Sequence, residues 1–464
     1  MLFSSILFLF RFIPAVFLVY YLLPFRFKNL WLFLCSLFFY AWGEPKYFPI
    51  MMSSILVNYL AALLIDRWKE RGGLRRAAFL VSLVFTVGWL LFFKYMNFFI
   101  GNFNVATGLS VPFLSLALPL GISFYTFQIL SYTVDVYYGR VPAERNFIRF
   151  GAFVTLFPQL IAGPIVKYTD INEELHTRTV TYEMLGDGVR LFIMGLGSKV
   201  LIANNIGSLW DTVVGMGFEN VSTPLCWMGL IAFSLYIYFD FSGYSLMAIG
   251  LGNAMGFRFP QNFNFPYISR SATEFWRRWH MTLGSWFREY VYIPLGGNRV
   301  GRGRLYLNLF IVWFLTGFWH GANWLFVLWG LYFLALLVVE KTFLLRYLER
   351  SRVWSRVYLL FFVVLSWGFF AIGLEELKGA QGLLPQLFGR LFCWRGGADW
   401  VYYLRNYGVT FALAIFFSTP AIKWIYERLA HKKWLVTAGL AAVLLASVGY
   451  LVDASYNPFL YFNF

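Results

Sequence analysis

The chain has 464 residues, of which 60% are hydrophobic, 22% aromatic and only 13% charged, and its mean hydropathy is +0.64. Soluble domains carry about 25% charged residues, so this composition excludes a soluble protein. The formal net charge is +16, but the sequence has no separate basic domain, which argues against nucleic-acid binding. The three cysteines, Cys35, Cys226 and Cys393, follow neither metal-site nor disulfide-framework spacing.

Apolar stretches long enough to cross a bilayer, about 20 residues each, recur along the whole chain. We expect spans at residues 1–23, 29–43, 46–66, 77–99, 113–138, 185–207, 224–255, 305–340, 355–374, 408–424 and 434–452. No small-residue cleavage site follows the first stretch, so we expect it to be retained as a span. Proline and glycine interrupt segment 150–165, and charges interrupt segment 274–295. These two segments predict re-entrant or interfacial structure.

Clusters of Lys and Arg predict the orientation, because such clusters stay on the cytoplasmic side. They lie at Arg26 and Lys28 and at residues 66–76, 139–149, 340–356 and 423–433. Placing all of them in the cytoplasm puts both termini outside but leaves an odd number of spans between Arg149 and Lys341. Either 150–165 crosses the membrane or 305–340 bends into two passes. The positive charge itself has two interpretations, anchoring at anionic lipid or a basic mouth for an anionic substrate.

Two of the four histidines directly follow a tryptophan in strongly apolar sequence. The first lies in EFWRRWH (274–280). Residues 275–290 predict one helix with an aromatic stripe, which comprises Trp276, Trp279, Leu283, Trp286, Phe287 and Tyr290. Arg277, Arg278 and Arg288 fall largely off this stripe, whereas His280 belongs to its aromatic flank. The pattern fits an interfacial helix or a helix beside a water-filled cavity, and it leaves a functional and a structural role for His280 equally open.

The second histidine, His320, lies in GFWHGANW (317–324), inside an almost fully apolar stretch. Thr316 and Asn323 lie four residues before and three residues after it, which predicts one polar stripe on a helix. Gly317 and Gly321 would let a neighbouring helix or a ligand approach closely. An ionisable side chain in a membrane segment is costly to bury, so a functional role is favoured over hydrogen bonding between helices.

Two imidazoles suit acyl transfer, because an imidazole can take a proton from a hydroxyl at neutral pH. The deprotonated alcohol would then attack a thioester. The sequence has no G-x-S-x-G string of a serine nucleophile; DFSGYS (240–245) does not fit that pattern. It also has no His, Asp or Glu cluster at metal-ligand spacing. These observations favour an imidazole base without a metal.

Three strings resemble the membrane-bound O-acyltransferase (MBOAT) superfamily and, within it, the alginate O-acetyltransferase-like branch. They are FPQLIAGPIVKY (157–168), the segment from YFDFSGYS through WRRWH to YIPLGGNR (238–299), and FLTGFWHGANWLFVLWGLYF (314–333). With the terminal NPFLYFNF, the resemblance covers essentially the whole chain and is concentrated in 157–333. The D-alanyl transferases of teichoic-acid modification share the two-histidine plan but usually lack a YIPLGGNR string.

The resemblance implies a single transmembrane domain over 1–464, with a catalytic core at about 150–340 and a ring of helices around a central tunnel. In all, we expect about 11 or 12 spans in an all-α polytopic protein of the cell (cytoplasmic) membrane. His320 matches the catalytic residue of the superfamily, taken as the general base, and His280 matches the second active-site residue. No bound cofactor is implied. The donor would be acetyl-CoA or another acyl thioester from the cytoplasm, and the acceptor an extracytoplasmic polysaccharide or a relay protein.

The sequence departs from the branch pattern at Leu246, where aspartate is common, at Glu289, which replaces aspartate, and at Phe265, where histidine is frequent. Asp240 and Glu289 remain as nearby carboxylates.

The expected roles follow from the resemblance and from side-chain chemistry. His280 would position the acceptor or polarise the thioester carbonyl, and Asn323 or Thr316 would fix the tautomer of His320. The remaining candidates for substrate or donor binding are Trp276, Arg277, Arg278, Trp279, Arg288, Asp240 and Glu289. A guanidinium fork suits the phosphates of the donor or of lipid headgroups, although positive-inside anchoring explains the arginines equally well.

Two other functions compete with the acyltransferase. A secondary transporter or flippase would also contain broken helices and buried polar residues, but the internal repeat expected of it is not evident in the sequence. A structural scaffold is the weaker alternative.

Overall fold

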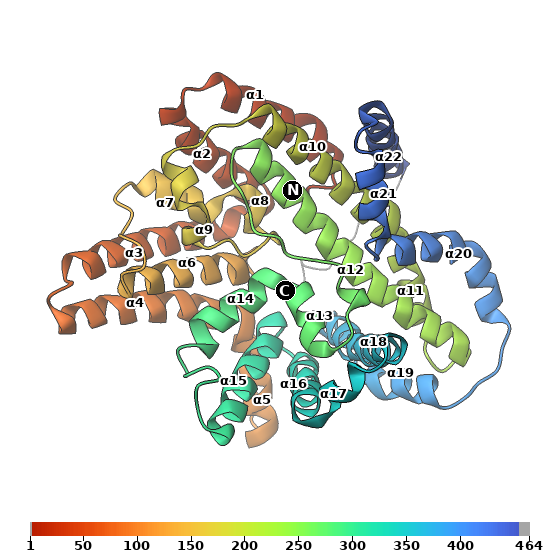
Figure 1. Ribbon diagram of the computed structural model, residues 1–464. Helices are drawn as coiled ribbons and strands as arrows, with labels where there is room; N and C mark the ends of the chain where they lie inside the picture. Colours follow the sequence, from red (N-terminus) through yellow and green to blue (C-terminus); the bar gives the residue numbers. More distant parts are fainter. Residues whose placement is uncertain (1, 454–464) are drawn as a thin grey trace. The chain divides into compact units, whose positions relative to one another are not determined.

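The computed structural model describes residues 2–453, and over these residues the chain forms helices and no strand (Figure 1). The predicted all-α fold is confirmed. The terminal string NPFLYFNF (457–464) lies outside the described residues. Contacts divide the chain into two compact units. Of the described residues, unit 1 comprises 2–192 and Met247–Pro260, and unit 2 comprises Ile193–Leu246 and 261–453.

Unit 1 is built from the first ten α-helices and part of α12. Their bounds are η1 (Phe8–Phe12), α1 (Ile13–Leu22), α2 (Phe25–Gly43), η2 (Pro45–Tyr47), α3 (Phe48–Arg67), α4 (Gly72–Leu90), η3 (Leu91–Tyr95), α5 (Met96–Thr107), α6 (Ile122–Tyr137), α7 (Phe147–Thr155), α8 (Phe157–Leu160), α9 (Tyr168–His176) and α10 (Tyr182–Gly197). Helices α3, α4 and α6 pack on one another, and α2 packs on α7. Buried Asn58 of α3 donates to Thr86 of α4 at 2.8 Å, which is the kind of polar contact that joins helices in a membrane.

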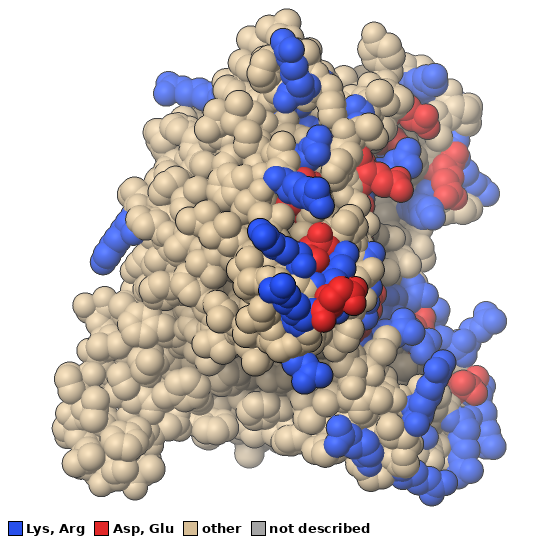
Figure 2. Space-filling model, turned by 90° about the vertical axis from the view of Figure 1, so that its left-hand side faces the viewer, with Lys and Arg blue, Asp and Glu red and all other residues tan. Residues whose placement is uncertain are grey.

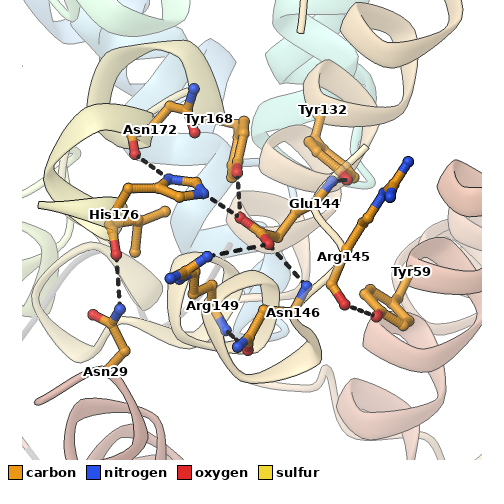
Figure 3. Close-up of polar contacts among 11 residues, drawn as sticks. Asn29, Tyr59, Tyr132, Glu144, Arg145, Asn146, Arg149, Tyr168, Asn172 and His176 are labelled. Atoms are coloured by element: carbon orange, nitrogen blue, oxygen red, sulfur yellow. Dashed lines mark hydrogen bonds and ion pairs between the residues drawn. The ribbon is translucent and has the colours of Figure 1, made fainter. Parts of the chain in front are cut away.

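A buried carboxylate, Glu144, joins the loop after α6 to helix α9 in unit 1 (Figure 3). It accepts hydrogen bonds from the Tyr168 hydroxyl at 2.9 Å and from the Asn146 backbone N–H at 2.8 Å. The Nε2 atom of His176 lies 3.2 Å from the same carboxylate, and its Nδ1 atom faces the Asn172 carbonyl oxygen at 2.9 Å. This network gives His176 a structural role in unit 1.

Unit 2 holds the remaining helices and the other part of α12. Their bounds are η4 (Ser198–Ala203), α11 (Asn204–Met216), α12 (Thr223–Ala254), η5 (Pro266–Ile268), α13 (Ala272–Arg278), α14 (Met281–Phe287), η6 (Arg288–Tyr292), α15 (Arg302–His320), α16 (Trp324–Val339), η7 (Glu340–Leu344), α17 (Leu345–Leu348), α18 (Arg352–Leu377), α19 (Leu383–Phe392), α20 (Asp399–Phe417), α21 (Ala421–Leu429) and α22 (Lys433–Asp453). Helix α16 packs on α15, α18 and α13.

Helices α15 and α16 lie side by side as a hairpin (Figure 1). A Cβ atom on Gly317 would overlap the Phe326 carbonyl oxygen, and one on Gly330 would overlap the Trp313 carbonyl oxygen. The two backbones therefore touch at glycines, as in close helix pairs of membrane proteins. The structure therefore shows a bend within residues 305–340, as one of the two explanations of the odd span count requires.

Six described helical segments are long and apolar enough to cross a membrane, and a seventh is added if α20 and α21, bent by 75°, form one span. The six segments are Pro45–Arg67, Gly72–Thr107, Thr223–Ala254, Trp324–Leu348, Arg352–Leu377 and Lys433–Asp453. Fewer segments pass this test than the 11 or 12 expected spans, because the other helices are shorter, bent or more polar. The span expected at 113–138 is wrong in its first part, since the helix begins only at Ile122.

The surface carries the pattern of a protein surrounded by lipid. Figure 2 shows Lys, Arg, Asp and Glu gathered over part of one face, which leaves wide areas of that face without charge. Large apolar side chains are exposed, among them Leu445 of α22 at 72%. Contiguous apolar surface of this extent would aggregate in water. The protein is therefore a multi-pass membrane protein.

Candidate active site

His280 lies in a break between two short helices of unit 2. Helix α13 ends at Arg278 and α14 begins at Met281, and His280 between them has a φ of +43°. The prediction of one continuous helix over 275–290 is therefore wrong. A side chain other than glycine in this left-handed region costs about 1–3 kcal/mol, and such residues cluster at functional sites.

Asn262 stabilises this conformation of His280. Its backbone carbonyl accepts a hydrogen bond from the Met281 N–H at 2.9 Å. Its side-chain Oδ1 accepts from the Thr282 hydroxyl at 2.9 Å and from the Thr282 N–H at 3.3 Å, and it lies 3.0 Å from Nδ1 of His280. Because a backbone N–H can only donate, the amide atom facing it must be the oxygen. Nδ1 of His280 therefore carries the ring proton and donates it to Asn262.

This tautomer leaves a lone pair on Nε2 of His280. The side chain is only 1% exposed, and none of residues 2–453 offers Nε2 a hydrogen bond. Burial lowers the pKa of His280 to about 3, so the ring is neutral at physiological pH. The ring packs edge-on against Phe241 with the centroids 4.6 Å apart. The aromatic flank predicted within one helix is not formed, and the rings near His280 are those of Phe241, Phe263 and Trp319 instead.

His320 is the last residue of α15 and is also buried, at 3% exposure. Its ring lies against Trp329 of α16 with the centroids 5.0 Å apart, and against Phe370 of α18 at 5.2 Å. Three helices of unit 2 thus enclose this imidazole. Burial of an ionisable imidazole among apolar side chains is costly, so a functional role is favoured for His320.

Trp319 brings the two histidines together. Its ring centroid lies 5.0 Å from that of His320 and 6.2 Å from that of His280. The two Trp-His strings, which lie far apart in the sequence, therefore meet across one indole. This geometry places both imidazoles beside one indole, and we treat them together as one candidate site.

The predicted polar stripe around His320 is not formed as expected. The backbone leaves the helix at Gly321, and Asn323 lies beyond this break as the N-cap of α16, where its Oδ1 accepts from the Leu325 N–H at 2.7 Å. Its amide nitrogen donates to Glu376 at 2.8 Å. The Thr316 hydroxyl donates to the Val312 carbonyl at 2.7 Å. Through these hydrogen bonds Asn323 stabilises the turn between α15 and α16.

Asp240 forms a buried ion pair rather than a solvated carboxylate. Lys199 of η4 lies 2.5 Å from it, and both side chains are at most 1% exposed. The next residue along α12 is Phe241, which contacts the His280 ring. The ion pair therefore supports the wall of the site.

The three candidate arginines occupy different environments. Arg278 pairs with Glu274 at 3.0 Å and donates to the Asn264 carbonyl at 3.2 Å. Arg277 and Arg288 are exposed, and Glu289 in η6 is half-buried. Arg277 and Arg288 are thus accessible to phosphates of a donor or of lipid, whereas Arg278 braces its own loop.

The candidate tryptophans form part of an aromatic cluster beside the imidazoles. Trp276 packs edge-on against Trp313 at 4.9 Å and against Trp329 at 5.6 Å. Trp279 packs against Trp367 at 4.8 Å. In the structure these two rings pack α13 onto α15, α16 and α18.

Comparison with known proteins assigns the family. The model of the membrane-bound O-acyltransferase family matches residues 140–374, a range that contains both imidazoles. The chain belongs to the membrane-bound O-acyltransferase family. As a member of this family, it is an O-acyltransferase.

Several relatives of this O-acyltransferase match along most or all of its length. A "Probable alginate O-acetylase AlgI" of Pseudomonas putida is 36% identical over 100% of both chains. One of the same name from Pseudomonas aeruginosa is 41% identical over 84% of this chain and 75% of its own. A "Peptidoglycan O-acetyltransferase" of Helicobacter pylori is 34% identical over 100% of this chain and 98% of its own. The resemblance to the alginate-type branch is confirmed.

Asn262 and Trp319 were not predicted as site residues of this O-acyltransferase. Asn262 lies 18 residues before its histidine, and a helical periodicity connects only residues three or four apart. A polar residue in the aromatic string PQNFNFPY (260–267) was an available signal. Trp319 adjoins His320 in the sequence, but its contact with His280 depends on tertiary structure.

Proposed function

We propose that this protein transfers an acetyl group from a cytoplasmic acyl thioester to hydroxyls of an extracytoplasmic polysaccharide. The observation that carries the proposal is the meeting of two buried imidazoles, His280 and His320, at Trp319. The names of the relatives support acetyl as the group and a polysaccharide or peptidoglycan as the acceptor. Acetyl-CoA is the proposed donor, and the cytoplasmic membrane the proposed location.

In the proposed reaction, His320 takes the proton of the acceptor hydroxyl. The acceptor oxygen forms a bond to the acyl carbon, the carbon–sulfur bond of the thioester breaks, and the proton held by His320 passes to the departing thiolate. Removal of solvent from the enclosed site strengthens each polar interaction in this step. Extracytoplasmic relay proteins would receive or pass on the acetyl group where the polymer cannot reach the site itself.

The tautomer of His280 favours one of its two expected roles. A neutral ring with Nδ1–H bound to Asn262 presents a lone pair at Nε2. Such an atom accepts a hydrogen bond from an alcohol and cannot donate one to a carbonyl oxygen. We therefore assign His280 to orienting the acceptor by accepting a hydrogen bond from a second hydroxyl beside the reacting one, whose own proton goes to His320, rather than to polarising the thioester carbonyl.

Replacement of His320 by alanine tests the proposal in cells. We expect His320→Ala to remove acetyl groups from the cell-surface polymer, since no other imidazole takes its place against Trp329. The measurement is the acetyl content of the isolated polymer, with membrane insertion confirmed by detergent extraction and size-exclusion chromatography. Full acetylation by an inserted, folded variant would contradict the proposal.

A further inference from the structure

Glu340 is a buried carboxylate in an apolar membrane helix, and the proposed reaction gives it no task. It is 0% exposed and begins the π-helix η7, which continues α16 within the candidate span Trp324–Leu348. An ionisable residue in a membrane span is costly and is usually retained for function. Short π-helical turns inside α-helices are likewise frequent at functional sites.

The Glu340 carboxylate binds the first turn of α13. Its Oε1 accepts from the Ala272 N–H at 2.5 Å, and its Oε2 accepts from the Thr273 N–H at 3.0 Å and from the Thr273 hydroxyl at 2.9 Å. The first N–H groups of a helix have no partner within the helix, and the positive end of the helix dipole favours a negative charge. Glu340 thus provides the hydrogen-bond acceptors and the negative charge that the first turn of α13 lacks within its own helix.

Helix α13 leads directly to His280. Two residues after its last helical turn the chain reaches the left-handed His280. Helix α16, which η7 with Glu340 continues, carries Trp329, and the Trp329 ring contacts both His320 at 5.0 Å and Trp276 of α13 at 5.6 Å. The continuous helix of α16 and η7 therefore contacts His320 and also binds the start of α13, the short helix that precedes His280.

We propose that Glu340 is a positioning residue that fixes α13, and through it His280, relative to α16 and His320. The inference rests on the proposed function, because it assigns Glu340 to the relative placement of the two proposed active-site imidazoles. A misplacement of about 1 Å in a reacting group can lower a rate about 100-fold. Three hydrogen bonds at the start of α13 resist such a shift.

The variant Glu340→Gln removes the charge and keeps the volume. Its amide oxygen still accepts, but in either orientation its NH2 group faces a backbone N–H, of Ala272 or of Thr273, which can only donate. The matched control is Glu349→Gln, the same chemical change nine residues along the chain at an exposed position. Both proteins would be purified in lipid nanodiscs and compared in thermal stability with the wild type.

The readout is the rate of acetyl transfer from radiolabelled acetyl-CoA to mannuronate oligosaccharides, corrected for the amount of folded protein. We expect E340Q to lower kcat about 10- to 100-fold, because His280 is displaced relative to His320. The change in KM for acetyl-CoA should be smaller, because the exposed Arg277 side chain can follow a small shift of α13. E349Q should match the wild type. An E340Q kcat equal to that of the wild type would overturn the inference.

A second comparison separates positioning from stability. Asn262→Ala also loosens His280, so E340Q should lower kcat less in the N262A background than in the wild type. If E340Q lowered kcat by the same factor in the wild type and in N262A, the two substitutions would act independently, and the inference would be overturned. If E340Q does not fold, Thr273→Val takes its place, with an expected loss in kcat of about fivefold for one lost hydrogen bond. An unchanged kcat in T273V would then count against the role of Glu340.

These outcomes are distinguishable from failure of the proposed function. A wild-type protein that transfers no acetyl group to either mannuronate or peptidoglycan fragments contradicts the proposed function itself. An active wild type, an inactive His320→Ala variant and a fully active E340Q contradict only the role of Glu340.

Discussion

His280 keeps a backbone conformation that free peptides avoid, and its surroundings stabilise that conformation. Only His280 and Phe265 among the described residues other than glycine have a positive φ. Phe265 lies three residues after Asn262, and the side-chain oxygen of Asn262 contacts Nδ1 of His280 and accepts from the Thr282 N–H in the first turn of α14. Stored strain that depends on one amide is a property of a functional site rather than of a stable core.

Asn262→Asp tests whether the neutral state of His280 matters. A carboxylate 3.0 Å from Nδ1 would favour the imidazolium and raise the pKa of His280 from about 3. The imidazolium carries a proton on Nε2, so this atom can no longer accept a hydrogen bond from a hydroxyl of the acceptor. We expect the N262D rate of acetyl transfer to fall as pH decreases through the raised pKa, within a range where the wild-type contribution of His280 is constant.

The measurement is the pH profile of kcat between pH 5 and 9 (about the range in which an imidazole titrates in proteins). Asn264→Asp is the matched control, because Asn264 lies two residues away and is exposed. Superimposable profiles for N262D and the wild type would show that the protonation of His280 is irrelevant to the reaction.

Among the elements, the α15–α16 hairpin contributes most to the site. It places His320 at the end of one helix and Trp329 in the facing helix, and glycines let the backbones touch. A side chain at Gly317 would overlap the Phe326 carbonyl oxygen, which belongs to backbone and cannot rotate away. The hairpin therefore tolerates little change at this position.

Gly317→Ala is expected to lower the unfolding temperature and the rate of acetyl transfer, because overpacking costs about 1–3 kcal/mol and displaces His320, which lies one turn further along α15. The control is Gly303→Ala in the first turn of the same helix, where no atom lies within 4 Å of the added Cβ. That substitution should be neutral or stabilising, since alanine favours helix over glycine by about 1 kcal/mol. Equal unfolding temperatures and rates for the two variants would contradict the close approach.

The sequence predicted long apolar helices well and short broken ones poorly. The break at Gly321 was readable, since Asn323 before an apolar run is an N-cap signal. The break at His280 was not, because the aromatic residues of 275–290 keep helical spacing through it. At the break the Met281 N–H donates to the carbonyl oxygen of the distant Asn262 instead of to a helical carbonyl, and such a contact leaves no periodic trace in the sequence.

At the scale of the whole molecule, composition and motif strings predicted the fold class and the family, whereas span counting predicted the number of spans poorly. Low charge content and apolar length indicated an all-α membrane protein, and the strings around His280 and His320 indicated the family that residues 140–374 match. Span counting was less successful, because the expected spans at 1–23, 113–138 and 185–207 contain α1, α6 and α10, which have only 10, 16 and 16 residues. Elements that line a site inside a membrane need not have the length of a span.

The central claim is acyl transfer at the site of His320 and His280 from a donor on one side of the membrane to an acceptor on the other. The most direct measurement reconstitutes the protein in sealed vesicles, with radiolabelled acetyl-CoA outside and mannuronate oligosaccharides trapped inside. Wild-type protein should produce acetylated oligosaccharide in the lumen, and His320→Ala, inserted to the same extent, should produce none. Luminal product formed by His320→Ala at the wild-type rate, or intact labelled thioester in the lumen without acetylated sugar, would contradict the claim.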